Sequence, residues 1–280
     1  SVLVDAALTS HVLGRAVLQA AVHVLQPLAI PVMPLKGLWL QQFVYGESGG
    51  RVITDVDVLV PERDFSAARR ALEGANFRPS GANVSDAAYV APGLPLPLDL
   101  HRRLFTRGAF RVQPNDLFAR GTPDRMTFGV PVVQPDACDV LSHLIGHALK
   151  GGTAWTGSGH ELRDIPRLAA AYQLAPARCA ERLWRCGLAR AARFVLPLTA
   201  AEDARGFGAA VLACLPSDPL GERLVQALLR LRAHHMRQGS SAEAPAWPGF
   251  LLDSSVPHGV AALALRLWDK PLEARRHERP

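Results

Sequence analysis

Two aspartates, Asp55 and Asp57, stand two positions apart in the apolar segment VITDVDVLV (residues 52–60). Side chains two apart on a β-strand point to the same face, so this segment, as a strand, presents both carboxylates together. Two neighbouring anions in apolar surroundings are costly unless a cation neutralises them. Carboxylate oxygens are the ligands that Mg²⁺ prefers, so the pair indicates a magnesium site. The alternative is an edge strand whose polar face lies in water.

Three further features favour a catalytic site. Lys36-Gly37 follows an apolar stretch and opens a helix pattern, where backbone N–H groups can approach a phosphate. Arg51 lies four residues before Asp55, and a guanidinium binds phosphate through two hydrogen bonds. Asp99, in the extended segment LPLDLH, offers a third carboxylate on a separate strand. The three carboxylates are expected to form a two-metal site for phosphoryl or nucleotidyl transfer.

Helix and strand patterns alternate in the first half of the chain and would position these residues. Apolar residues recur at helical spacing over 8–27, 37–45 and 63–75, and extended patterns lie at 30–35, 52–60, 96–101 and 126–133. Within 52–60, we expect Val52, Val56, Val58 and Val60 on one face, with Ile53, Asp55, Asp57 and Leu59 on the other.

From residue 135 onward the patterns are helical. They cover about 136–150, 161–175, 177–195, 201–214, 219–238 and 257–276. The fold class is therefore expected to be α+β, with a mixed sheet and flanking helices over residues 1–134 and an all-helical domain over residues 135–280.

The segment PLKGLWLQQFVYGESGGRVITDVDVLV resembles the nucleotidyltransferase superfamily of DNA polymerase beta type, and most closely the branch described as uncharacterised nucleotidyltransferases. That branch has an apolar strand ending in Lys-Gly, a helix ending in Tyr, an Arg, then Asp-x-Asp-Leu-Val, and later Asp-Leu-His. Its counterparts here are Lys36-Gly37, Tyr45, Arg51, Asp55-Val56-Asp57 and Asp99-Leu100-His101. The resemblance continues more weakly into PDACDVLSHLIGHALK and LRDIPRLAAAYQL, and covers roughly residues 25–175.

The resemblance implies roles for these residues in a nucleotidyltransferase-like first domain. Asp55, Asp57 and Asp99 would be the catalytic, Mg²⁺-binding residues, and Asp99 would also lower the effective pKa of an acceptor hydroxyl or take its proton. The nucleotide-binding residues would be Lys36, Gly37, Arg51 and His101. Lys36 and Arg51 would neutralise the triphosphate of an NTP such as ATP, and Lys36 stands at a turn where the wider superfamily often has serine. His101 would orient Asp99 or contact the acceptor; a purely structural histidine is the alternative.

The sequence leaves the acceptor open among a small molecule, a peptide, a protein side chain and an RNA end. With 31 Lys+Arg and 25 Asp+Glu, the net charge of +6 is spread along the chain and argues mildly against a long nucleic acid. The alternative from another class is a non-catalytic nucleotide-binding module or a toxin–antitoxin partner. The presence of all three carboxylates, with Lys36 and Arg51, argues against it.

The four cysteines form no C-x-x-C pair, and the N-terminal residues show no leader pattern, so we expect a cytoplasmic protein. Because the sequence has no apolar run of about 20 residues, we expect no membrane partner.

Two other motifs carry weaker signals. His143 and His147 share a helix face, which suits a zinc site or ordinary helix packing, and the role of Asp164 in LRDIPRL stays open. Gly46-Glu47-Ser48-Gly49-Gly50 matches G-x-S-x-G, but a helix pattern precedes it and a strand follows, the reverse of a hydrolase nucleophile turn.

Overall fold

The computed structural model describes residues 2–46, 50–82, 86–106, 109–150, 153–157, 159–237 and 252. The chain divides into two compact units. One comprises Ser1–Leu104 with Gln113–Val140, and the other Phe105–Val112 with Leu141–Pro280. The helix predicted at 257–276 lies outside the described residues, and the domain boundary near residue 134 stays a prediction.

The first unit contains a five-stranded mixed sheet with helices packed on it. Its strands are β1 (Met33–Pro34), β2 (Val56–Leu59), β3 (Arg78–Ala82), β4 (Asp86–Val90) and β5 (Pro97–His101). The order across the sheet is β1-β2-β5-β4-β3, in which β2 and β5 are parallel and the other neighbours antiparallel. The segment between β2 and β5 contains a helix and the β3–β4 hairpin, long enough for the crossover that parallel strands require.

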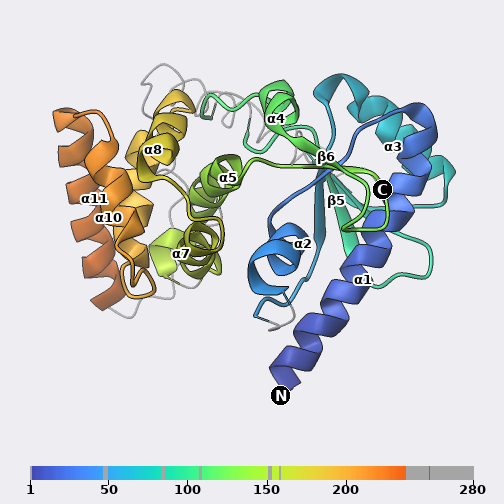
Figure 1. Ribbon diagram of the computed structural model, residues 1–280, viewed down its shortest axis with the longest axis horizontal. Coiled ribbons are helices and arrows are strands. Elements are labelled where there is room, and N and C mark those ends of the chain that lie inside the picture. Colours follow the sequence, from blue (N-terminus) through green and yellow to red (C-terminus); the bar gives the residue numbers. More distant parts are fainter. Residues whose placement is uncertain are drawn as a thin grey trace, which may run out of the picture. The chain divides into compact units, whose positions relative to one another are not determined.

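One face of this sheet forms the hydrophobic core of the unit. Helices α1 (Val2–Leu25) and α3 (Phe65–Gly74) contact each other, and α1 also contacts β2 and β5 (Figure 1). The strand residues that belong to this core alternate along the chain: Val56, Val58, Leu98 and Leu100. Because side chains alternate across a strand, residues 57, 99 and 101 project from the opposite face.

The predicted strand 52–60 is shorter in the structure, where β2 begins only at Val56. Ahead of it, the backbone N–H of Ile53 donates to Ser10 Oγ at 3.0 Å instead of to a neighbouring strand. As a result, the expected alternation is wrong at its start: Ile53 is buried in the core and Val52 is 42% exposed.

The remaining elements of the first unit are short. They are the 3₁₀ turns Gln26–Leu28 and Glu62–Asp64, α2 (Lys36–Leu40), the π-helix Gln41–Tyr45, α4 (Pro114–Arg120), β6 (Thr122–Asp124) and β7 (Val132–Gln134). The helix predicted at 37–45 thus consists of an α-helical and a π-helical part. The extended pattern at 126–133 contributes to β7, which pairs with β6 in an antiparallel hairpin.

The second unit is helical in its described residues, which confirms the α+β class. Its helices are α5 (Ala137–Lys150), of which the residues from Leu141 onward are assigned to this unit, α6 (Thr153–Thr156), α7 (Glu161–Ala171), α8 (Pro176–Arg185), α9 (Ala189–Val195), a 3₁₀ turn Leu196–Thr199, α10 (Phe207–Cys214) and α11 (Pro219–Arg237). The single helix predicted at 177–195 is two helices, because Gly187 adopts a left-handed φ of 75° and ends the first. No described helix is long and apolar enough to cross a membrane.

Candidate active site

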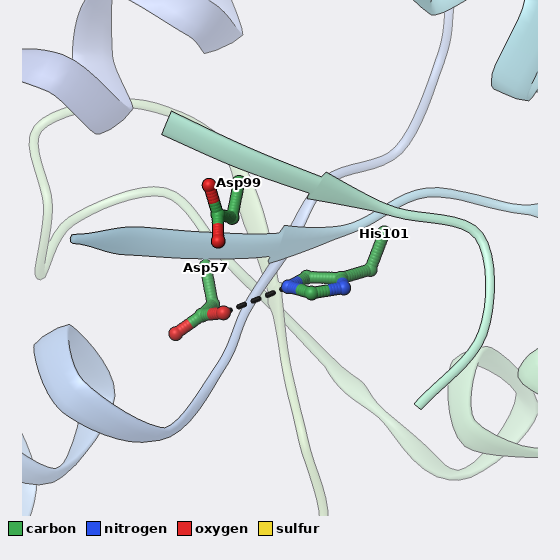
Figure 2. A group of neighbouring side chains, drawn as sticks. All are labelled: Asp57, Asp99 and His101. Carbon is green, nitrogen blue, oxygen red and sulfur yellow. Dashed lines mark hydrogen bonds and ion pairs between the residues drawn. The ribbon is translucent and has the colours of Figure 1, made fainter. Parts of the chain in front are cut away.

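Asp57 on β2 and Asp99 on β5 are direct register partners in the parallel strand pair. His101 lies two residues after Asp99 on the same face of β5. Donor atoms of these three side chains all lie within 4.8 Å of one another (Figure 2). The sheet therefore brings together two predicted metal ligands and one predicted nucleotide-binding residue.

Asp57 is the most buried member of this group, with only 2% of its surface exposed. His101 Nε2 lies 2.7 Å from one carboxylate oxygen, Oδ1, and Lys36 Nζ lies 3.2 Å from the other, Oδ2. A buried carboxylate requires such compensation, because desolvation of an uncompensated charge is costly. The Asp57 side chain thus links β2, on which it lies, to the last residue of β5 and the first residue of α2.

The Asp99 carboxyl is in an electrostatically unfavourable position. Burial raises its pKa, and the negative charges of Asp57 and Asp55 raise it further, against the opposing effects of His101 and Lys36. A raised pKa means that the ionised form lacks compensation. A bound cation beside Asp99 would supply it.

Asp55 lies just before β2 and is half-buried. Its Oδ1 accepts a hydrogen bond from Thr54 Oγ1 at 3.2 Å, and it is not a member of the three-residue donor group. Its charge nevertheless acts on Asp99, as the pKa of that residue shows. Asp55 as a catalytic, Mg²⁺-binding residue stays a prediction.

Lys36 and Gly37 begin α2 directly beside Asp57. The backbone N–H of Leu35 donates to the Asp57 carbonyl at 2.9 Å, which fixes the start of the helix next to the carboxylate. A Cβ added at Gly37 would lie 3.8 Å from Arg51 Nε, so the Arg51 guanidinium packs against this turn. Arg51 is itself 8% exposed. The structure therefore places Lys36 beside Asp57, and Arg51 against the turn at which Lys36 and Gly37 lie.

Gln41, which the sequence analysis did not single out, is completely buried in the π-helix. Its Nε2 donates to the Gly46 carbonyl at 2.8 Å, and its Oε1 accepts from the Arg51 backbone N–H at 3.1 Å. The available signal was a polar residue amid the apolar helix pattern LWLQQFVY. Periodicity alone could not identify its partners, since they follow the helix along the chain.

The donor set of the group fits a divalent metal ion. Carboxylate oxygens suit hard cations such as Mg²⁺, and an imidazole nitrogen adds affinity for Mn²⁺ and later first-row metals. Among the residues that the structure describes, Asp57, Asp99 and His101 are the one group of three side chains placed to hold a metal.

In the helical unit, the two histidines of α5 make packing and ion-pair contacts. His147 Nδ1 lies 2.8 Å from Glu161 Oε1, while the ring of His143 packs edge-on against Phe105 and His147. Within the described part of the chain they belong to no three-ligand group. Asp164 is fully buried in α7, and its role stays open.

Comparison with known proteins agrees with this geometry. The family model described as "Uncharacterised nucleotidyltransferase" matches residues 6–201, well over half of the chain. No curated protein matches the chain. The matched range includes every residue of the candidate site.

Proposed function

The chain belongs to the uncharacterised nucleotidyltransferase family, and from this premise we propose that it transfers a nucleotidyl or phosphoryl group from an NTP to an acceptor hydroxyl in a reaction that requires a divalent metal. The acceptor is a small molecule, a peptide or a protein. The observation that carries the proposal is the register pair Asp57–Asp99, with Lys36 and Arg51 beside it. We also propose that the protein is cytoplasmic, as the sequence leads us to expect.

Asp57 and Asp99 would hold the cation, with His101 as a third donor. Asp55 would complete a second cation position, since its charge already acts on Asp99. Such an ion, Mg²⁺ in the first instance, supplies positive charge against the triphosphate and the developing charge of the transition state.

Asp99 would serve as the proton acceptor of the reaction. In nucleotidyl transfer, the acceptor oxygen forms a bond to the α-phosphorus while the bond to pyrophosphate breaks, and the hydroxyl proton passes to the Asp99 carboxylate. In phosphoryl transfer, the same steps occur at the γ-phosphorus with a nucleoside diphosphate as the leaving group. A raised pKa suits a general base, because the pKa of the Asp99 carboxyl then lies closer to the pH at which the reaction proceeds.

Lys36 and Arg51 would bind the triphosphate. Lys36 is paired with Asp57, so nucleotide binding would exchange that carboxylate partner for phosphate oxygens. Arg51 would contribute the two-pronged contact that a guanidinium makes with phosphate.

Thermal unfolding with ATP, GTP, CTP and UTP, each with and without Mg²⁺ or Mn²⁺, tests the binding step. At least one NTP should raise the melting temperature of the wild type only when metal is present. Asp57→Asn should remove this effect. Asp139→Asn is a matched control, because Asp139 is 3% exposed, is paired with Arg120 and is not a member of the donor group.

Incubation of the protein with each labelled NTP and fractionated acceptors, followed by mass spectrometry, tests the transfer step. A mass gain equal to a nucleotide or a phosphate identifies the reaction. Metal-dependent NTP binding without any transfer, across small-molecule, peptide and protein fractions, would instead support the non-catalytic nucleotide-binding module.

A further inference from the structure

The side-chain amide of Gln41 bridges the two described ends of the segment that leads from the π-helix to Arg51. Its donor end binds the Gly46 carbonyl, and its acceptor end binds the Arg51 N–H. The backbone N–H of Gly46 in turn donates to the Gln41 carbonyl, the i→i+5 bond of a π-helix. One buried residue therefore contacts the segment at Gly46 twice and at Arg51 once.

The hydrogen bond from the Arg51 N–H to Gln41 fixes the position of the Arg51 backbone, from which the side chain extends. Arg51 lies outside any helix or strand, so no ladder of backbone hydrogen bonds positions it. Arg51 is nonetheless buried, and its guanidinium packs against the turn formed by Gly37 and by Lys36, the residue that pairs with Asp57. Holding a long side chain in one place costs conformational entropy, and fixing its backbone reduces the freedom that remains to be lost.

A second contact fixes the same segment independently. A Cβ at Gly50 would overlap the ring of Tyr45, the last residue of the π-helix, so the Tyr45 ring lies directly on the Gly50 backbone. Residues 50 and 51 are thus both held from the π-helix, one by packing and one by a hydrogen bond.

We propose that Gln41 is a positioning residue for nucleotide binding: its amide holds the Arg51 backbone so that the guanidinium is preorganised to bind the triphosphate. Gln41 itself does not contact the nucleotide. The inference rests on the proposed function, because it takes Arg51 to be a triphosphate ligand.

Amide hydrogen exchange of the unmodified protein tests the bridge without any nucleotide. The Arg51 amide should exchange at least 10-fold more slowly than an unprotected amide, although it lies outside regular structure. In Gln41→Met, which has similar volume and no amide, this protection should disappear. Free exchange of the Arg51 amide in the wild type would overturn the inference.

Nucleotide titration then tests the role. Gln41→Met should weaken binding of the best of the four NTPs by about 10-fold at saturating metal, and Arg51→Ala by about 10- to 100-fold. The double variant should bind no more weakly than Arg51→Ala alone, because Gln41 acts through Arg51. Metal affinity without nucleotide should not change.

Gln19→Met is the matched control. Gln19 Nε2 donates to the Phe128 carbonyl at 2.7 Å in the same unit, so its replacement also removes an amide-to-backbone bond. It should leave NTP affinity unchanged. Gln41→Glu keeps an acceptor for the Arg51 N–H and should retain more NTP affinity than Gln41→Met.

The outcomes separate the inference from the proposed function. A wild type that binds none of the four NTPs would overturn the proposed function, and with it the role of Arg51. A wild type that binds an NTP, with Gln41→Met binding it equally well, would overturn the inference alone. If Gln41→Met does not fold, amide exchange of the wild type and titration of Gln41→Glu decide between the outcomes.

Discussion

Asp57 and Asp99 are opposite each other across two parallel strands, 42 positions apart in the chain. The neighbouring residues Val56, Val58, Leu98 and Leu100 point into the core. Since this core fixes which face each strand presents, the hydrophobic packing of the sheet also holds two carboxylates side by side. Their repulsion is the energetic cost of this arrangement, and a cation would offset it.

Asp99→Asn should separate stability from activity. The variant should keep much of the NTP binding and lose about 10²- to 10⁴-fold in turnover, because the general base is removed. In metal-free protein, by contrast, it should melt at a higher temperature than the wild type at neutral pH. Turnover close to that of the wild type in a folded variant would remove Asp99 from the catalytic residues.

The pH dependence of that stability difference has a defined sign. Burial raises the pKa of Asp99 in the folded state above its unfolded value, so the folded protein binds the proton more tightly. The stabilisation that comes from proton binding at Asp99 is complete below the unfolded pKa and is lost as the pH rises through the folded pKa. The melting temperatures of wild type and Asp99→Asn should therefore converge as the pH falls, and a constant difference would contradict the origin assigned to it.

Asp57→Asn and Asp55→Asn should differ in the absence of metal. Asp57 is buried between Lys36 and His101, so its replacement should destabilise the metal-free protein by about 1–3 kcal/mol. Because Asp55 is only half-buried, Asp55→Asn should change the free energy of unfolding by no more than about 0.5 kcal/mol. Both should abolish or weaken metal-dependent stabilisation by NTP. Chemical denaturation in EDTA and thermal shift with metal and NTP measure the two effects separately, and equal destabilisation in EDTA would contradict this assignment.

His101→Gln should change which metal the site prefers. If the imidazole nitrogen is a ligand, its loss should lower the affinity ratio of Mn²⁺ to Mg²⁺ by about 10-fold. Titration of Mn²⁺ by electron paramagnetic resonance, with Mg²⁺ as competitor, measures this ratio. An unchanged ratio would restrict His101 to its hydrogen bond with Asp57.

Two glycines near the site should respond to alanine in opposite directions. Gly50→Ala should destabilise the protein by about 1–3 kcal/mol, because the new Cβ would displace the buried Tyr45 ring. Gly37→Ala meets Arg51 Nε only at 3.8 Å and lies in a helix, so it should be neutral or stabilising by about 0.4–1 kcal/mol. Urea denaturation of both variants checks the contrast, and a stable Gly50→Ala would show that Tyr45 can move.

Asp124 should contribute stability that disappears in acid. Its burial would raise the carboxyl pKa, but hydrogen bonds from Thr127, Gln134 and the Met126 backbone outweigh burial and hold the pKa at about 2 instead of 3.8. A lowered folded pKa means that the contribution is complete above the unfolded value and is lost as the pH falls towards about 2. Asp124→Asn should be less stable than wild type at pH 7, with a difference that shrinks below pH 4. A difference that persists at pH 2 would contradict it.

The helical part of the fold shows how far local patterns suffice. Apolar spacing predicted helices at 161–175 and 219–238, where α7 and α11 are found. It did not reveal the left-handed Gly187 that divides 177–195 into two helices. Nor did it show that α10 starts only at Phe207, where Asp203 accepts the first free N–H groups. Helix periodicity is a property of consecutive residues, whereas a break or a cap depends on one residue's conformation and its partner.

At the site, the spacing of residues along the chain is enough to predict which side chains share a strand face. Asp99 and His101 stand two apart on one strand, and Lys36 opens a helix, so their local placement follows from spacing. Family resemblance, borne out by the family match, then indicated the reaction class.

Which of these groups come into contact depends on how distant segments pair and pack. The β2–β5 register placed Asp57 opposite Asp99, the burial of Asp57 recruited both Lys36 and His101, and Ser10 redirected the chain so that Ile53, not Val52, is buried. The Gln41–Arg51 bond is likewise a contact of a buried amide that must find partners. Such contacts join two different segments through hydrogen bonding and burial. Periodicity describes only one segment at a time, so it cannot predict them.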